Sequence, residues 1–246
     1  MILRRLSQHV KDQNWFAVVL DFLIVVAGVL IAIQLANWNE ARARNVELRE
    51  QLGSLHGEFT ENLSRFDGYR DRLQSQMADI ATLRQIIAGG SPPDDMREVD
   101  RMLINSFSIL VFTAEQTTFD ELVAGGALRR LESLNLREPL ASWEQALASY
   151  RRLEVDALEQ RNLAFVPFAM EELAFGAMGE HYAWTETFIA PSPFRNTQEM
   201  IQANRQLDNI LVLRLGITAA ALDFLNALDA ATEIVVARLE AEGYAQ

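Results

Sequence analysis

Residues 15–38 read WFAVVLDFLIVVAGVLIAIQLANW, an almost wholly apolar stretch with Trp15 at one end and Trp38 at the other. As an α-helix, which rises 1.5 Å per residue, the stretch would be about 35 Å long, enough to cross a bilayer core of roughly 30 Å. Tryptophan favours membrane–water interfaces because its ring is apolar and its N–H needs a polar partner. The stretch therefore predicts a transmembrane helix over residues 15–38, with Trp15, Trp38 and the adjacent Asn39 at the interfaces.

Two other interpretations of this stretch are less consistent with its length. A cleaved signal peptide has a shorter apolar run and small residues before its cleavage site, whereas the candidate site at residues 34–36 begins with the large amide Gln34. A buried core helix seldom runs this far with so little charge. A retained membrane anchor is the interpretation that we favour.

The charges that flank the stretch give the expected topology. Three basic residues lie on each side of it: Arg4, Arg5 and Lys11 before, and Arg42, Arg44 and Arg49 after. Long domains cross a membrane largely regardless of their charge, whereas a short basic segment tends to stay in the cytoplasm. We therefore expect a cytoplasmic tail at residues 1–14, a single pass through the inner (cytoplasmic) membrane, and a periplasmic domain at residues 39–246.

Polar and small residues inside the anchor fall on one side of the expected helix. Gly28, Ala32 and Asn39 follow Asp21 by 7, 11 and 18 residues, spacings that place all four on one stripe. Gly28 and Ala32 form a small-xxx-small pair, which lets a second helix approach closely. Either the stripe is a helix–helix contact, with Asp21 protonated or paired with a cation, or Asp21 reaches the headgroups and the small residues are incidental.

The composition limits what the rest of the chain can be. Its 246 residues are 50% hydrophobic and carry a net charge of −12. Nucleic acid is not an expected partner, because phosphate binding needs a basic face. Apolar residues recur at steps of three and four, which predicts helices throughout. The predicted class is all-α, a single N-terminal transmembrane helix followed by an elongated antiparallel helical bundle.

Start and stop signals divide the bundle into helices. One helix should run from residue 48 to 87 and end at the sequence GGSPP (89–93), with kinks or close approaches at its glycines, Gly53, Gly57 and Gly68. Further helices are expected at 94–111, 119–123, 135–167 and 196–239, with Pro167 kinking or shortening one of them. Capping-box spacing marks three of the starts: Asp95 with Glu98, Asn135 with Glu138, and Asn196 with Glu199. The last helix is apolar enough to suggest a second span, but Arg214 and Asp223 disfavour that interpretation.

Two stretches carry a family resemblance. Residues 21–40, DFLIVVAGVLIAIQLANWNE, combine an acidic residue, a glycine in an Ile/Val-rich run, an Ala-x-Gln step and a closing Asn-Trp-Asn-Glu. Residues 118–128, TFDELVAGGAL, are followed by NLRE at 135–138. Both stretches resemble the DUF6090-type family of bacterial membrane proteins. The resemblance implies an anchored helical protein of unassigned activity and supplies no catalytic residue.

The sequence offers little catalytic chemistry. Its histidines, His9, His56 and His181, belong to no Glu-x-x-His or His-Glu-x-x-His motif, so we expect no metal, no cofactor and no enzymatic activity. His56 is expected on a solvated helix edge. The one candidate contact site is the irregular stretch at 176–194, where His181, Tyr182, Trp184 and Glu186 would meet a ligand or a partner protein, or would instead cover the end of the bundle.

These observations favour an interaction or scaffold protein. Its expected partners are the lipid bilayer and either further copies of itself or another membrane protein, as an oligomer or an accessory subunit of a larger membrane complex. The alternative is a periplasmic ligand-sensing bundle that acts through a partner.

Overall fold

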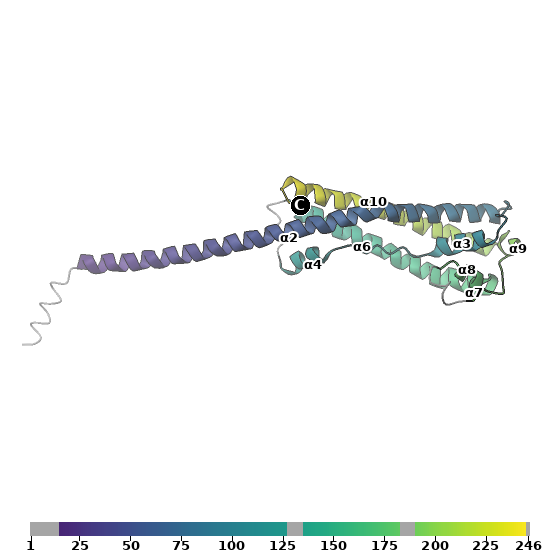
Figure 1. The fold of residues 1–246 in the computed structure, drawn as a ribbon, viewed down its shortest axis with the longest axis horizontal. Coiled ribbons are helices and arrows are strands. Elements are labelled where there is room, and N and C mark those ends of the chain that lie inside the picture. Colours follow the sequence, from purple (N-terminus) through teal and green to yellow (C-terminus); the bar gives the residue numbers. More distant parts are fainter. Residues whose placement is uncertain (1–14, 127–134, 183–189, 245–246) are drawn as a thin grey trace, which may run out of the picture. The chain divides into compact units, whose positions relative to one another are not determined.

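The computed structural model describes residues 15–126, 135–182 and 190–244, and these ranges contain helices and connecting segments but no strand (Figure 1). The predicted all-α class is therefore confirmed for the described part of the chain. The chain divides into two compact units, Met1–Leu52 and Gly53–Gln246.

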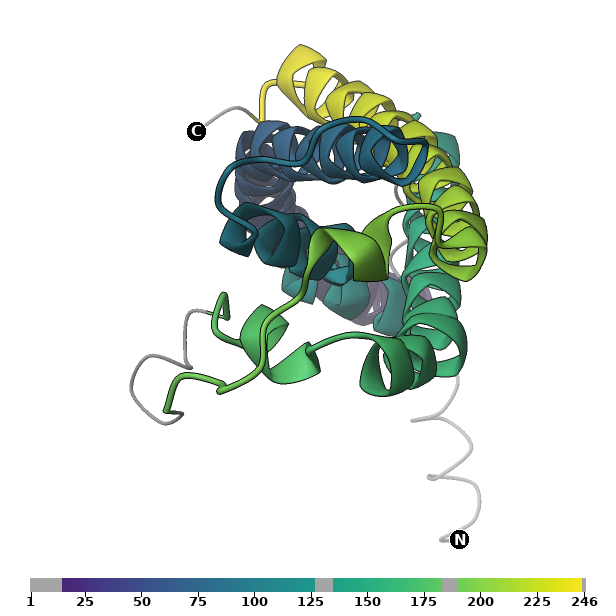
Figure 2. The ribbon, with the colours of Figure 1, turned by 90° about the vertical axis from the view of Figure 1, so that its right-hand side faces the viewer.

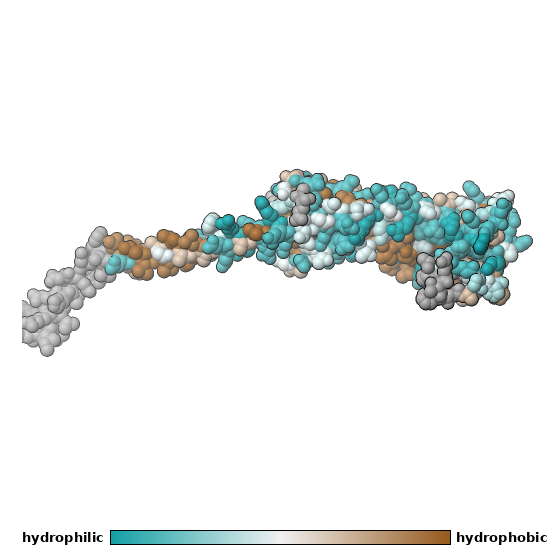
Figure 3. Space-filling model, viewed as in Figure 1, coloured by the Kyte–Doolittle hydropathy of each residue, from teal (hydrophilic) through white to brown (hydrophobic). Residues whose placement is uncertain are grey.

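Helix α2, Trp15–Ile87, is unbroken and contributes to both units. In the first unit, side chains from residue 19 to residue 40 are exposed, apart from the half-buried Val26. Figure 3 shows the apolar members of this stretch in brown. Trp15 begins the helix, but its side chain lies outside the described residues. The anchor predicted over 15–38 is thus helical, and its described side chains, from residue 19 onward, are exposed except for Val26.

Shorter helices and a second long one complete the second unit. They are α3 (Arg97–Phe107), α4 (Thr117–Ala124), α6 (Arg137–Gln160), the π-helix η2 (Arg161–Phe165), α7 (Val166–Glu172), α8 (Phe175–Gly179), α9 (Gln198–Ile201) and α10 (Arg205–Ala241). Helices α6 and α10 lie side by side in Figures 1 and 2. They run in opposite directions, because contacts join Trp143 to Thr232 and Ala157 to Arg214.

Apolar residues spaced four or seven positions apart on α2 form one wall of the core of the second unit. Leu55, Phe59, Phe66, Leu73 and Ile80 are all buried, as their spacing requires if one face of α2 packs against the rest of the unit. Aromatic side chains extend this core along its length, with ring contacts between Phe59 and Trp143, Phe66 and Phe112, and Phe107 and Phe165.

The glycines within α2 and those just after its end have different structural roles. The helix ends at Ile87, as predicted, and the chain turns at Gly89, whose φ of 100° suits glycine. A Cβ at Gly90 would lie 2.8 Å from the carbonyl oxygen of Gln85, so this turn also needs glycine. The expectation of kinks or close approaches is wrong for Gly57 and Gly68, because the helix continues through both and a Cβ there would meet nothing within 4 Å.

The helix predicted over 94–111 is shorter than expected, because α3 ends at Phe107. Residues 108–116, called here the extended segment, contain the β-branched Ile109, Val111 and Thr113, which favour extended backbone. Side chains from α2 supply hydrogen bonds that a helix would have made internally. Gln76 Nε2 donates to the carbonyl oxygen of Ser108, and Tyr69 Oη donates to that of Val111, each at 2.8 Å.

The predicted capping boxes are wrong in detail. Helix α6 begins at Arg137 with no side-chain cap, since Asn135 adopts a positive φ of 52°. Helix α10 begins at Arg205, where Asn204 Oδ1 accepts a hydrogen bond from the backbone N–H of Leu207 at 3.0 Å. Asp95 Oδ1 accepts from the backbone N–H of Arg97, the first residue of α3, so only part of that box forms.

The effect predicted for Pro167 appears as a change of helix type. Helix α6 ends at Gln160, the wider η2 follows, and α7 then begins with Pro167 in its first turn. Proline lacks the N–H that a helix interior needs, and a wider turn before it removes that need.

Two helices among the described residues are long and apolar enough to cross a membrane, α2 from Val19 and α10. None of the most apolar window of α2 is buried, whereas 28% of that of α10 is buried.

Candidate functional sites

The four residues of the predicted contact stripe, Asp21, Gly28, Ala32 and Asn39, all lie exposed on α2. A Cβ built on Gly28 would meet no atom within 4 Å. The helix surface at this point is therefore open, and a second helix could pack closely against it. Trp38, which the sequence predicts at a membrane interface, is 61% exposed, and the guanidinium of Arg42 lies 6.0 Å from its ring centroid.

The predicted contact site at 176–194 is only partly described. His181 is exposed and follows the short α8, whereas Tyr182 is half-buried and packs against the core. Trp184 and Glu186 lie outside the described residues. The structure thus places Tyr182 as a side chain that covers the core and His181 as a surface residue beside it.

Next to His181 lies a polar cluster that the sequence analysis missed. Asp100 of α3 is 1% exposed, and its Oδ1 accepts a hydrogen bond from Asn196 Nδ2 at 2.6 Å. Asn196 Oδ1 accepts in turn from the backbone N–H of Ala174 at 2.7 Å. Burial raises the pKa of Asp100, while the hydrogen bond from Asn196 and the charge of His181 oppose that rise. The only sequence signal was an acidic residue on the apolar face of a predicted helix.

Asn196 therefore fastens connecting segments to α3 and does not cap the last helix as predicted. Beside it, Glu180 Oε1 accepts hydrogen bonds from the backbone N–H of Ser192 at 2.7 Å and from Arg195 Nη1 at 3.0 Å. These contacts hold the two ends of the stretch that contains the undescribed residues 183–189.

Arg214 forms a second polar cluster, in the middle of the second unit. Its side chain donates to the carbonyl oxygens of Ser106 at 2.8 Å, Ser108 at 2.7 Å and Ala157 at 3.3 Å. Arg214 is 2% exposed, and burial lowers the pKa of its guanidinium to about 10. It bonds to backbone carbonyls at the end of α3, at the start of the extended segment and in α6, so its role is to join three parts of the unit.

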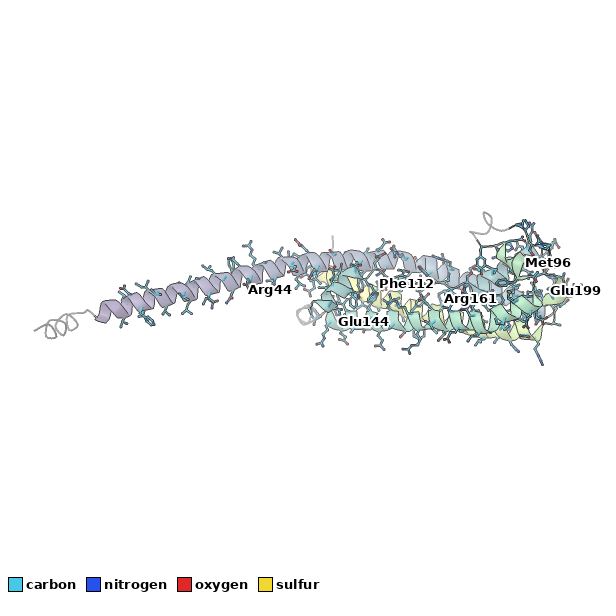
Figure 4. The ribbon with its side chains drawn as sticks, turned by 90° about the horizontal axis from the view of Figure 1, so that it is seen from below. Arg44, Met96, Phe112, Glu144, Arg161 and Glu199 are labelled. Atoms are coloured by element: carbon cyan, nitrogen blue, oxygen red, sulfur yellow. The ribbon has the colours of Figure 1, made fainter. Side chains whose placement is uncertain are left out.

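A cavity of about 20 Å³ adjoins Arg214, with Gln76, Tyr150, Glu154 and Thr218 also in its wall. This volume suits one water molecule and excludes an organic ligand. Glu154 Oε1 accepts from the backbone N–H of Phe112 at 2.6 Å, and burial raises the pKa of Glu154. Figure 4 labels Phe112, which lies between α2 and α6 through its contacts with Phe66 and Glu154.

The remaining histidine of the second unit differs from expectation. His56 is 8% exposed, so its predicted place on a solvated edge is wrong, and its Nε2 lies 3.5 Å from Glu240 Oε1. Within the described residues, no group of three or more His, Cys, Asp or Glu side chains is placed to hold a metal ion.

Comparison of the chain with family models, with curated proteins and with solved structures yields no match.

Proposed function

We propose that this protein is a membrane-anchored scaffold. Residues 15–38 cross the inner membrane once, the N-terminus is cytoplasmic, and residues 39–246 form a periplasmic, elongated antiparallel helical bundle. The observation that carries the proposal is the exposure of the apolar side chains of α2 from residue 19 to residue 38, apart from the half-buried Val26. An apolar helical surface of this length is stable in lipid and unfavourable in water.

Polar contacts of α10 support a single span. Asp208 Oδ1 accepts from Arg84 Nε at 2.8 Å, and Asp229 Oδ2 accepts from Arg70 Nη2 at 2.5 Å. Arg214 adds its bonds to backbone carbonyls of the same unit. Moving α10 into lipid would break these contacts and leave charged groups in hydrocarbon, at a cost of about 3 kcal/mol for each charge near the centre of the bilayer.

Scaffolding would begin with self-association of the anchor. The open surface at Gly28 and Ala32 lets a second copy approach closely, and Asp21 would then lie at the edge of the helix–helix contact. An acidic group near the membrane interface is least costly where it shares a proton or meets a cation, and a helix pair provides such a setting. The periplasmic unit would then display its surface in two or more copies.

Cysteine cross-linking tests this proposal directly, because the chain contains no cysteine. Ala32→Cys lies on the contact stripe, whereas Leu30→Cys lies at nearly the same depth on the opposite side of the helix. In native membranes under mild oxidation, we expect a disulfide-linked dimer of Ala32→Cys and little dimer of Leu30→Cys. Equal cross-linking of the two variants, or none of either, would contradict self-association through this stripe.

A steric test complements the cross-linking. Ala32→Ile adds bulk on the stripe, and Ala27→Ile adds the same bulk elsewhere on the span. We expect Ala32→Ile to lower the oligomeric mass in mild detergent and Ala27→Ile to leave it unchanged. The same mass for all three proteins would count against the stripe.

The topology has its own measurement. Glu144 is exposed on α6 and is labelled in Figure 4, so Glu144→Cys presents a thiol on the second unit. A membrane-impermeant maleimide added to intact spheroplasts should label this thiol. If labelling required lysis, the second unit would be cytoplasmic and the proposed orientation wrong.

A further inference from the structure

A second face of α2 begins where the contact stripe ends. Trp38, Arg42, Asn45 and Arg49 follow one another at steps of four, three and four residues, so they lie on one side of the helix. We call this set the basic face. Together with Ala41, Val46 and Glu50, it lines a shallow depression of about 510 Å³, all within the first unit.

The arginines of the basic face have no acidic partner among the residues that the structure describes. The one contact that the structure gives Arg42 is with the ring of Trp38, and neither Arg42 nor Arg49 forms an ion pair with a described residue. Arg44, by contrast, donates to Glu40 Oε2 at 3.3 Å on the other side of the helix (Arg44 is labelled in Figure 4). Residues 39–50 have as many acidic as basic side chains, and Glu50 lines the same depression, but it forms no ion pair with Arg42 or Arg49.

The position of this face relative to lipid rests on the proposed function. With Trp38 at the interface, the helical rise places the Cα of Arg42 about 6 Å and that of Arg49 about 17 Å further out. The headgroup layer is roughly 5–8 Å thick, so Arg42 lies within it. The Cα of Arg49 lies about 9 Å beyond that layer; helical side chains lean toward the N-terminus of the helix, which here is the membrane side, so the guanidinium of Arg49 acts on the layer across a distance comparable to the screening length of about 8 Å.

We propose that the basic face binds the headgroup of an anionic phospholipid. Arginine presents a planar fork of N–H donors that matches phosphate oxygens. Asn45, between the two arginines, adds an amide donor for a headgroup oxygen. Trp38 below them contacts the glycerol and upper acyl region, the depth that its amphipathic ring favours.

Native mass spectrometry of the full chain tests this inference. The protein is released from micelles that contain equal amounts of phosphatidylglycerol and phosphatidylcholine, and the lipids that stay bound are counted. A basic residue near an anionic surface contributes about 1 kcal/mol, so Arg42 alone corresponds to about 5-fold in affinity, and the more distant Arg49 adds a smaller factor. We expect the wild-type protein to retain phosphatidylglycerol preferentially and Arg42→Gln/Arg49→Gln to lose most of that preference.

A matched control removes the same net charge elsewhere. Arg44→Gln/Arg205→Gln alters one arginine paired with Glu40 and one exposed arginine of α10, so it should keep the wild-type preference. Equal retention of both lipids by the wild-type protein would overturn the inference, as would an unchanged preference in Arg42→Gln/Arg49→Gln. A lower oligomeric mass of that variant with unchanged lipid retention would mean that the face binds a second copy, and this too would overturn it.

Carbonate extraction of native membranes that contain the wild-type protein or Arg42→Gln/Arg49→Gln separates this inference from the proposed function. If the anchor is correct, wild-type and variant chains both remain in the membrane pellet whatever lipid they retain. Release of the wild-type chain would refute the anchor itself. Retention in the pellet without a lipid preference would refute only the basic face.

Discussion

Asn62 of α2 makes two hydrogen bonds with the backbone of Glu115, one as donor and one as acceptor. Its Nδ2 donates to the carbonyl oxygen of Glu115, and its Oδ1 accepts from the N–H of the same residue, each at 2.8 Å. Asn62 is fully buried. An amide side chain here pairs with the extended segment as a neighbouring strand would, so an isolated extended chain is satisfied without a sheet.

Asn62→Ala should destabilise the second unit and loosen the extended segment. The backbone N–H and carbonyl of Glu115 would each lose a partly buried hydrogen bond, and each such loss costs about 1 kcal/mol. We expect a lower urea midpoint and faster amide hydrogen exchange at residues 108–116. Asn209→Ala, at an exposed position of α10, is the matched control and should change stability by less than about 0.5 kcal/mol. Slow exchange maintained in Asn62→Ala would show that the side chain is dispensable.

Arg214→Met should be among the most damaging single substitutions in the chain. It removes three hydrogen bonds from a charged donor, those to the carbonyl oxygens of Ser106, Ser108 and Ala157, and we expect a loss of about 3–5 kcal/mol in the free energy of unfolding. Gln76 Nε2 still donates to the carbonyl of Ser108, and the backbone N–H of Arg161 still donates to that of Ala157. Arg214→Lys keeps the charge but cannot reproduce the fork, so an intermediate loss of about 1–3 kcal/mol is expected. Arg205→Met, at an exposed position, controls for the loss of one charge. Chemical denaturation monitored by circular dichroism measures the free energy of unfolding of the three variants. Equal stability of Arg214→Met and Arg205→Met would refute the role of the buried guanidinium.

Thr232→Val tests the contact between α6 and α10. Trp143 Nε1 donates to Thr232 Oγ1 at 3.1 Å, and both residues are fully buried. Valine has the same shape but no acceptor, so an unsatisfied indole N–H should cost about 1–3 kcal/mol. Thr218→Val is a suitable comparison, because Thr218 Oγ1 donates only to the Arg214 carbonyl within its own helix. A larger loss for Thr218→Val than for Thr232→Val would contradict this assignment.

Asp100→Asn should change stability in a pH-dependent way. Burial raises the pKa of Asp100 in the folded state above its usual value of 3.8. The carboxyl therefore contributes most to stability below pH 3.8, and this contribution is lost as the pH rises through the folded-state pKa. Asparagine stays neutral and can still accept from Asn196, so Asp100→Asn should melt at a higher temperature than the wild-type protein at pH 7.

The advantage of Asp100→Asn should shrink as the pH falls toward 4, where the wild-type carboxyl takes up its proton. Asp223→Asn, at an exposed position, should show no such trend. A lower melting temperature of Asp100→Asn at pH 7 would mean that the charge of Asp100 stabilises the fold, contrary to the effect of its burial.

The sequence predicted the features that depend on the periodicity of apolar residues and on the restricted backbone conformations at glycine and proline. The apolar series that includes Phe59 and Phe66 identified the buried face of α2, and GGSPP identified its end. Contacts between distant residues could not be predicted in this way. The extended segment departs from helix because Gln76, Tyr69 and Asn62 bond to its backbone, and their pairing depends on tertiary structure.

The same limit applies to the polar clusters. Asn196 fits a capping box by spacing, yet it bonds to Asp100 across 96 positions of sequence. Arg214 counted against a second span on charge alone, but its bonds to carbonyls of α3, α6 and the extended segment require their arrangement in space. A polar residue on the buried face of a helix indicates that a hydrogen-bond partner exists, but it does not identify that partner.

The spacing of the side chains that hold the extended segment constrains insertions and deletions. Asn62, Tyr69 and Gln76 are seven residues apart, about 10.5 Å of helix, and they bond to Glu115, Val111 and Ser108, which are four and three extended residues apart, about 10–13 Å. A one-residue insertion in α2 would turn every later side chain by about 100° and detach it from its carbonyl. Changes in length that preserve the fold therefore have to occur in α2 and in the extended segment together. Seven residues added to or removed from α2 would match three or four in the extended segment.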